Sequence, residues 1–124
     1  LALNGLDVFN FSIKEVPAAV KDFIKKTNQE NEKFDYFIMH QANKLMNETI
    51  RKKLKFEAEK VPYSISKYGN TSSASIPLTI VSELQEKVTS EEVSILMTGF
   101  GVGLSWAVSC VSLDRIVCPN VIEL

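Results

Sequence analysis

Three short segments of this 124-residue chain carry residue types that can do chemistry, and each follows an apolar run. The first holds His40, the only histidine; the second holds Asn70, between a glycine and a threonine; the third is the glycine-rich turn Gly99–Gly103. A neutral imidazole, a side-chain amide and the backbone amides of a glycine turn are all hydrogen-bond donors. Together they could stabilise negative charge that develops on an oxygen atom during a reaction.

Each of these features also has an ordinary structural explanation. His40 could be a structural histidine with satisfied hydrogen bonds, and Asn70 could be a turn residue, because asparagine and glycine tolerate left-handed backbone conformations. The glycine turn could join two strands of a hairpin. It is no dinucleotide-binding loop, because it precedes a strand rather than a helix and lacks the required spacing.

Hydrophobic periodicity predicts the element order helix, strand, helix, strand, helix, strand, strand. The predicted helices cover residues 8–27, 45–54 (with Asn43 as the N-cap) and about 72–88, and the predicted strands cover residues 34–40, 61–66 and two runs within 93–113. The start of the first helix stays open, because Phe9, Phe11 and Ile13 also alternate as they would in a strand.

Two prolines restrict where the helices can run. Pro17 should kink or interrupt a helix that starts as early as residue 8, because proline lacks the backbone N–H. Pro77 fits only if the third helix begins near Ser72 or Ser73, since the first amides of a helix have no intrahelical partner.

The predicted order implies an α/β fold with a mainly parallel sheet covered by helices and a last strand that reverses direction. In open α/β sheets, sites form at the carboxyl ends of the parallel strands. The segments with His40, Asn70 and the glycine turn all leave the predicted strands at that edge. We therefore expect them to meet at one rim, where they would form a set of donors for an oxyanion.

Composition excludes several classes of function. With a net charge of -1, the chain has no general attraction to nucleic acid or to anionic membranes, and no apolar run is long enough to span a bilayer. The two cysteines and one histidine make a poor zinc set, so no metal is expected. Cys110 is expected in the core, Cys118 has no assigned role, and a reducing, cytoplasmic setting is expected. The chain has no initiator methionine, which suggests a piece of a longer protein.

Three ordered motifs, "HQAN" (40–43), "YGNTSSASIP" (68–77) and "GFGVGLSW" (99–106), resemble the C-terminal half of β-ketoacyl-acyl-carrier-protein synthases III, of the thiolase-like superfamily. The resemblance runs from about residue 5 to about residue 111. It implies a three-layer, thiolase-like half with a mixed, mainly parallel sheet and an antiparallel final strand, and it favours a helix over residues 8–13. Residues 1–124 would be the C-terminal domain, without the N-terminal half that carries the nucleophilic cysteine.

The resemblance also implies a role for particular residues. His40 and Asn70 would be the catalytic donors that stabilise the enolate oxygen. The other implied site residues are Phe100, Gly101 and the Val102 amide at the oxyanion and pocket, Asn43 and Phe9 at the substrate channel, and Lys44, Lys52 and Lys53 at the carrier-docking surface. Leu45 stands where the family often has a basic residue, and neither cysteine matches the position of the nucleophile.

The implied activity is a decarboxylating condensation in fatty-acid biosynthesis. A cysteine would take an acyl group from acyl-coenzyme A, and malonyl-acyl-carrier protein would supply the enolate, with no further cofactor. The implied partners are acyl-carrier protein, the missing N-terminal half and a second copy in a full-length homodimer; the isolated chain should be inactive. Two alternatives stay open: a paralogue of polyketide or secondary metabolism, and a non-catalytic acyl-carrier-binding module. A cysteine upstream of this chain would favour an enzyme over the binding module.

Overall fold

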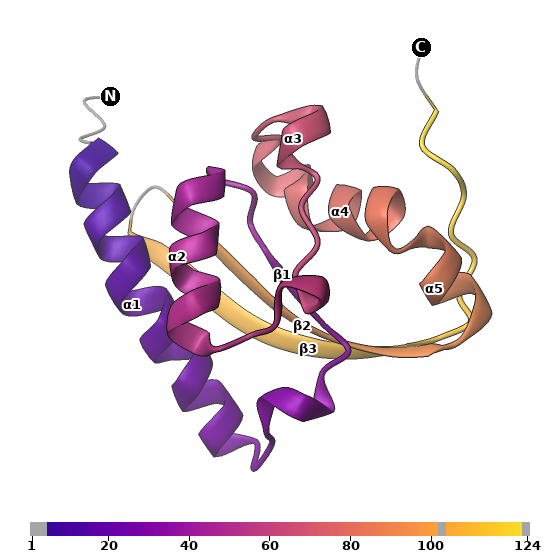
Figure 1. Ribbon diagram of the computed structural model, residues 1–124, viewed down its shortest axis with the longest axis horizontal. Coiled ribbons are helices and arrows are strands. Elements are labelled where there is room, and N and C mark those ends of the chain that lie inside the picture. The colour runs from indigo at the N-terminus through magenta and orange to yellow at the C-terminus, as the bar shows by residue number, and fades with distance from the viewer. Residues whose placement is uncertain (1–4, 102–103, 123–124) are drawn as a thin grey trace.

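A three-stranded sheet crosses the middle of the molecule (Figure 1). The computed structural model describes residues 5–101 and 104–122. The strands are β1 (Tyr36–Met39), β2 (Glu92–Gly101) and β3 (Ser105–Asp114), and β2 lies between the other two. β1 runs parallel to β2, whereas β3 runs antiparallel to it. The mixed sheet with a reversed last strand is therefore confirmed.

Helices cover both faces of this sheet. α1 (Gly5–Lys26) and α2 (Lys44–Leu54) lie side by side on one face, and α4 (Ser75–Glu83) and α5 (Gln85–Ser90) lie on the other. The connections contain α3 (Ile65–Tyr68) and the 3-10 turns η1 (Asn31–Lys33), η2 (Ala58–Lys60) and η3 (Ser72–Ala74). The predicted three-layer α/β class is thus confirmed. Within the described ranges, no helix is long and apolar enough to cross a membrane.

Successive side chains of β1 enter two separate hydrophobic clusters. Phe37 and Met39 pack with residues of α1 and α2, whereas Ile38 packs with Leu84 and Val88 in the opposite layer. The three β1 side chains are completely buried. A strand covered on both faces requires this pattern, because its side chains point alternately to the two sides of the sheet. β1 is therefore held firmly from both layers, and it positions the residue that follows it, His40.

Of the two predicted effects of Pro17, a kink or an interruption, the interruption is wrong, because α1 runs through Pro17 as one helix. Pro17 has no N–H to donate to the carbonyl oxygen of Ile13, four residues earlier. Lys53 of α2 donates to that oxygen from Nζ, at 2.8 Å. The neighbouring helix thus supplies the hydrogen bond that proline cannot make, and the pattern of α1 by itself cannot show this.

The second predicted strand is also wrong: within the described residues, segment 61–66 forms no strand. Pro62 cannot donate to a sheet ladder. The amide of Ile65 donates instead to Gln41 Oε1, at 3.3 Å, and begins α3. Val61 and Ser64 are nevertheless buried. The alternation of apolar residues here reflects burial against the core rather than strand pairing.

The third predicted helix is divided in two. It begins with η3, continues as α4 from Ser75, and breaks at Leu84, whose φ of −122° lies outside the helical range. Pro77 is the third residue of α4, where its missing N–H would have no intrahelical acceptor. α5 lies beside the start of β2 (Figure 1), and Leu84 and Val88 are both buried in the cluster that contains Val93 of that strand.

The expected core position of Cys110 is wrong, because this residue is exposed on β3. β3 is an outer strand of the three-stranded sheet, and neither of its faces is as fully covered as those of β1 and β2. Cys118 is instead buried in the cluster beneath α5. Its carbonyl oxygen accepts a hydrogen bond from Gln85 Nε2 at 3.0 Å, which holds the tail against that helix.

Candidate active site

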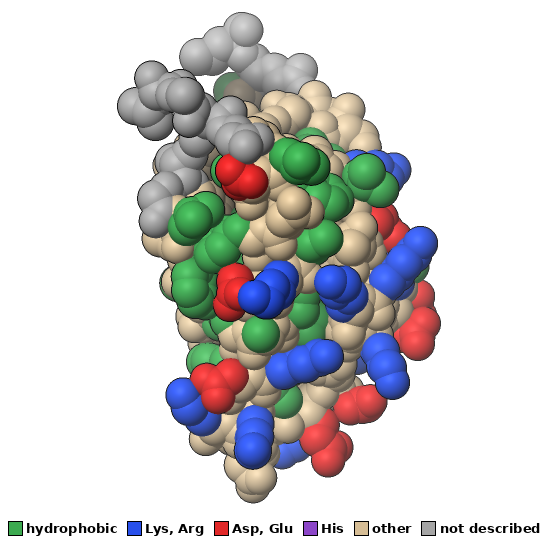
Figure 2. All heavy atoms as spheres, turned by 90° about the vertical axis from the view of Figure 1, so that its left-hand side faces the viewer, with side chains coloured by type: hydrophobic (Ala, Val, Ile, Leu, Met, Phe, Trp, Pro, Cys, Tyr) green, Lys and Arg blue, Asp and Glu red, His purple; other side chains and the backbone are tan. Residues whose placement is uncertain are grey.

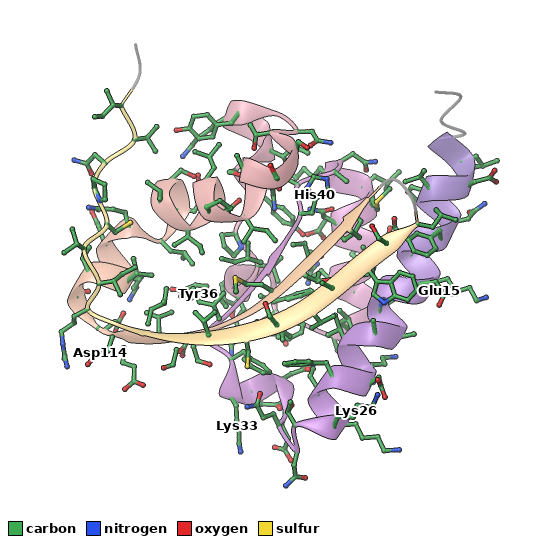
Figure 3. The ribbon with its side chains drawn as sticks, turned by 180° about the vertical axis from the view of Figure 1, so that it is seen from behind. Glu15, Lys26, Lys33, Tyr36, His40 and Asp114 are labelled. Atoms are coloured by element: carbon green, nitrogen blue, oxygen red, sulfur yellow. The ribbon has the colours of Figure 1, made fainter. Side chains whose placement is uncertain are left out.

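His40 lies at the carboxyl end of β1, and Tyr36 lies at the other end of the strand (Figure 3). The His40 N–H donates to the Thr98 carbonyl oxygen of β2 at 2.9 Å. The His40 carbonyl oxygen accepts from Asn47 Nδ2 of α2 at 3.1 Å. Thr98 and Asn47 are both completely buried. The backbone at His40 is therefore fixed by the sheet and by α2.

The imidazole of His40 lies between the α4 layer and the end of β2. Nδ1 is 2.8 Å from Ser75 Oγ, and the ring meets that of Phe100 edge-on, with centroids 5.5 Å apart and planes at 81°. Burial lowers the pKa of His40 below its ordinary value of 6.5, although a hydrogen bond with the backbone at Ser72 acts in the opposite direction. Burial therefore favours the neutral ring, which has one N–H and can donate it to an oxyanion.

Asn70 lies in the exposed turn between α3 and η3, and its side chain shapes this turn. Its Oδ1 accepts from the Ser72 N–H at 2.9 Å, which leaves the Nδ2 amide as the donor group. Gly69, with φ 68° and ψ −159°, takes a positive-φ conformation that glycine adopts without strain. The same segment leads to Ser75 and so to the His40 ring. That Asn70 Nδ2 and His40 reach one common atom stays a prediction.

The end of β2 brings the start of the glycine turn to the site. Phe100 is buried and touches His40, and Gly101 is the last residue of β2. The predicted oxyanion amide of Val102 lies outside the described residues. A hollow of about 290 Å³ lies beside this end of the hairpin; it is lined by Gly99, Phe100, Ser105, Trp106 and Ala107.

The two predicted channel residues both have structural contacts. Asn43 caps α2, because its Oδ1 accepts from the Met46 N–H at 2.8 Å, and the predicted N-cap is thus confirmed. Phe9 of α1 is partly buried against the cluster between α1, α2 and the sheet. Asn43 is exposed and follows His40 by three residues. A channel role for either residue stays a prediction.

The three predicted docking lysines, Lys44, Lys52 and Lys53, are exposed on α2. Figure 2 shows Lys and Arg side chains spread over this side of the molecule, with hydrophobic and some acidic side chains between them. Lys53 also has the structural contact with Ile13 described above. Leu45, next to Lys44, is 71% exposed, so the apolar residue at this position faces outward. The docking role stays a prediction.

Ser75 and Gln41 belong to the site, although the sequence analysis did not single them out. Ser75 Oγ contacts His40 Nδ1 and accepts from the Gln41 N–H at 3.3 Å. Gln41 is completely buried, and its Nε2 donates to the Met39 carbonyl oxygen at 2.9 Å. Both are polar residues inside the motifs that carry His40 and Asn70, which is the signal that could have found them. Within the described ranges, no three His, Cys, Asp or Glu side chains gather closely enough to hold a metal ion.

A three-layer half with a histidine at the carboxyl edge of a mixed sheet is the arrangement of a thiolase-like domain. The family described as 3-oxoacyl-acyl-carrier-protein (ACP) synthase III C terminal matches residues 24–113. The chain belongs to this family.

Relatives of known name agree with this assignment. The chain is 41% identical over 106 residues to beta-ketoacyl-acyl-carrier-protein synthase III of Staphylococcus epidermidis, covering 86% of this chain and 34% of that protein. It is 37% identical over 111 residues to the synthase III of Prochlorococcus marinus strain MIT 9515, covering 90% of this chain and 33% of that protein. The chain therefore spans about a third of the length of these relatives.

Solved structures give the same result. The crystal structure of 3-oxoacyl-(acyl-carrier protein) synthase from Burkholderia xenovorans LB400 matches with a TM-score of 0.91 at 37% identity, over 96% of this chain and 34% of that one. The priming beta-ketosynthase of the R1128 polyketide biosynthetic pathway matches with a TM-score of 0.80 at 28% identity, over 93% of this chain and 35% of that one. The similarity thus includes enzymes named as 3-oxoacyl-acyl-carrier-protein synthases and one named for a polyketide pathway.

Proposed function

We propose that this chain is the C-terminal domain of a decarboxylating condensing enzyme of fatty-acid synthesis. The observation that carries the proposal is His40: a neutral imidazole, held at the carboxyl edge of the sheet, in a family named for 3-oxoacyl-acyl-carrier-protein synthesis. The nucleophilic cysteine would come from a part of the protein outside this chain. That cysteine would take the acyl group of acyl-coenzyme A.

In the proposed reaction, the bond between the carboxylate and the α-carbon of the malonyl thioester breaks and CO₂ leaves. The electron pair moves onto the thioester carbonyl oxygen, where the His40 N–H and Asn70 Nδ2 donate to the enolate. The enolate carbon then attacks the acyl-cysteine carbonyl, a C–C bond forms, and the cysteine thiolate leaves. In this scheme neither His40 nor Asn70 acts as a nucleophile; both stabilise charge.

The test is made in the whole protein that contains this chain. His40→Ala and Asn70→Ala should each lower the rate of condensation about 10²–10³-fold, the usual loss when one donor to an oxyanion is removed. Transfer of a labelled acyl group from coenzyme A to the cysteine should continue, because this step needs neither enolate donor. The control is Lys33→Ala, an exposed residue of η1. Full condensation by both variants would refute the proposal.

A second candidate function is the priming condensation of a polyketide pathway, which the similarity to the R1128 priming ketosynthase favours. The two functions share the proposed chemistry and differ in the carrier protein and the acyl primer. Competition between the carrier proteins of the two pathways, with the same labelled acyl-enzyme, separates them. A higher kcat/KM with the polyketide carrier would replace the first candidate by the second.

A further inference from the structure

Ser75 Oγ is a buried hydroxyl that joins α4 to the loop after β1. It lies 2.8 Å from His40 Nδ1 and accepts from the Gln41 N–H at 3.3 Å. Ser75 is 1% exposed and is the first residue of α4. Its carbonyl oxygen accepts from Thr79 Oγ1, at 2.7 Å, within the same helix. The hydroxyl is therefore held by His40 and Gln41, and the backbone of Ser75 is held by Thr79.

Counting the hydrogen and the lone pairs of the Ser75 hydroxyl shows which group donates in the hydrogen bond between Ser75 and His40. A hydroxyl has one hydrogen and two lone pairs, and the Gln41 N–H uses one lone pair. Among the described contacts of Ser75 Oγ, His40 Nδ1 is the one that can accept a hydrogen bond. If Nδ1 carried the ring proton instead, two donors would point at Oγ and the buried O–H would lack a partner, which folded proteins avoid.

We infer that Ser75 is a positioning residue, whose hydroxyl donates to His40 Nδ1 and keeps the proton of the neutral ring on Nε2. The hydrogen bond of the ring with the backbone at Ser72 also needs a ring N–H, which in this tautomer is Nε2–H. The catalytic consequence rests on the proposed function, in which Nε2–H turns from the Ser72 backbone to the enolate oxygen. The contact with Phe100 supports this arrangement, since its edge-on ring restricts rotation of the imidazole. Ser75 thus sets both the tautomer and the orientation of His40.

The first test reads the tautomer directly and needs no substrate. His40 is the only histidine of the chain, so after labelling with ¹⁵N-histidine its ring gives an unambiguous pair of signals. In a longer protein, the His40→Asn variant identifies them. At pH 7.5 we expect Nε2 to have the ¹⁵N shift of a protonated nitrogen and Nδ1 that of an unprotonated one. The opposite assignment, with the proton on Nδ1, would overturn the inference.

A pair of variants separates this role from a general effect on stability. Ser75→Ala and Thr79→Val each remove one buried hydroxyl from the same side of α4, but Thr79 has no hydrogen bond with His40 among the described contacts. Ser75→Ala should move both ring ¹⁵N shifts toward a mixture of tautomers, whereas Thr79→Val should leave them unchanged. Ser75→Thr, which keeps the hydroxyl, should retain the original shifts, and it serves as the comparison with Thr79→Val if Ser75→Ala fails to fold. Unchanged shifts in Ser75→Ala, or shifts in Ser75→Thr that match the mixture, would contradict the inference.

Kinetics of the whole protein test the catalytic consequence. Ser75→Ala should lower kcat for condensation about tenfold and leave KM for the malonyl substrate unchanged, because a net hydrogen bond that matters in the transition state is lost. A rise in KM with kcat unchanged would assign Ser75 to substrate binding and refute the positioning role. If the whole protein performs no condensation, the proposed function fails, while the ¹⁵N shifts still decide whether Ser75 sets the tautomer.

Discussion

At the scale of single residues, the carboxylate of Glu48 on α2 accepts three side-chain hydrogen bonds, and it lies outside the three motifs. Arg51 donates to both carboxylate oxygens of Glu48, at 3.0 and 2.9 Å, and Tyr63 Oη donates to Glu48 Oε1 at 2.7 Å. Arg51 Nη1 also donates to the Phe56 carbonyl oxygen at 2.7 Å. The group thus joins α2 to the segments that follow it. A bidentate Arg–carboxylate pair of this kind is stronger than an ordinary surface pair.

The hydrogen bonds from Arg51 and then Tyr63 lower the pKa of Glu48 from its ordinary 4.5 to about 2. Because the folded pKa is below the unfolded one, the ionised group stabilises the fold above pH 4.5, and this contribution is lost as the pH falls toward 2. We expect Glu48→Gln to lower the free energy of unfolding at pH 7 by about 1 kcal/mol, since the pair is partly solvated. Urea unfolding at pH 7 and pH 2.5 checks this.

The control for this prediction is Glu59→Gln, which alters an exposed carboxylate of η2. Its effect should be within about 0.5 kcal/mol at both pH values, as is usual for exposed sites. The difference between Glu48→Gln and the original protein should shrink at pH 2.5. An equal difference at both pH values would show that the ionised form of Glu48 does not stabilise the fold.

At the scale of elements, α1 and α2 are joined through the carbonyl oxygen of Ile13 that Pro17 leaves without a helical partner. Lys53→Met keeps the aliphatic part of the side chain and removes the donor. A hydrogen bond to a charged group contributes about 1.5–3 kcal/mol. Because Lys53 is exposed, we expect the substitution to lower the free energy of unfolding by an amount near the lower end of this range. Thermal and urea unfolding measure the change.

The matched control is Lys52→Met on the same helix, because Lys52 is exposed and has no hydrogen bond or ion pair among the described contacts. It should change the stability by less than about 0.5 kcal/mol. A second comparison uses Pro17→Ala, which returns an N–H to α1. In the Pro17→Ala protein, Lys53→Met should lower the free energy of unfolding by less than it does in the original protein, because the Ile13 carbonyl oxygen regains a helical partner. Equal costs in both backgrounds would refute the explanation.

At the scale of the whole molecule, the basic side formed by α1 and α2 is a candidate surface for an acidic carrier (Figure 2). Lys52→Glu in the whole protein should raise KM for carrier-bound malonate several-fold at low salt and have less effect at high salt, because the attraction is screened. Lys53→Glu would also disturb the Ile13 contact, so Lys52 is the cleaner probe. Lys33→Glu, on η1, is the control. No effect of Lys52→Glu at low ionic strength would refute this docking role.

The isolated chain should not catalyse condensation. Cys110 is exposed midway along β3 and Cys118 is buried beneath α5, so neither cysteine lies in the site around His40. We expect no transfer of label from acyl-coenzyme A to either residue, and no ketoacyl product when malonyl-carrier protein is added. Stoichiometric acylation of Cys110 followed by product would contradict this.

The isolated chain should also self-associate, which sedimentation over a range of concentrations can measure. Several large apolar side chains are well exposed; they are Leu6, Leu45, Leu104, Trp106, Val117 and Ile122. β3 is hydrogen-bonded to one neighbouring strand in the described sheet and so presents an open edge. A single monomeric species at high concentration would show that this surface does not drive association.

The amino-acid sequence by itself determined the features that depend on neighbours along the chain. The Asn43 cap and the hairpin around the glycine turn follow from local hydrogen bonds and from a period of 2 residues. Periodicity left residues 8–13 open between helix and strand; the resemblance favoured the helix that α1 forms there. The order of elements and the three motifs then predict the α/β class and place His40 at the end of a strand. These features need no knowledge of distant contacts.

Only the tertiary structure decided which distant groups meet. Lys53 reaches Ile13 across 40 positions, and Ser75 reaches His40 across 35. These contacts let α1 continue past Pro17 and provide the hydrogen bond that selects one nitrogen of the imidazole. Segment 61–66 alternates like a strand, yet its polar groups bond to Gln41 and the α4 layer instead. The physical reason is that a buried polar group takes whichever partner the packing brings near it, and local periodicity contains no information about that partner.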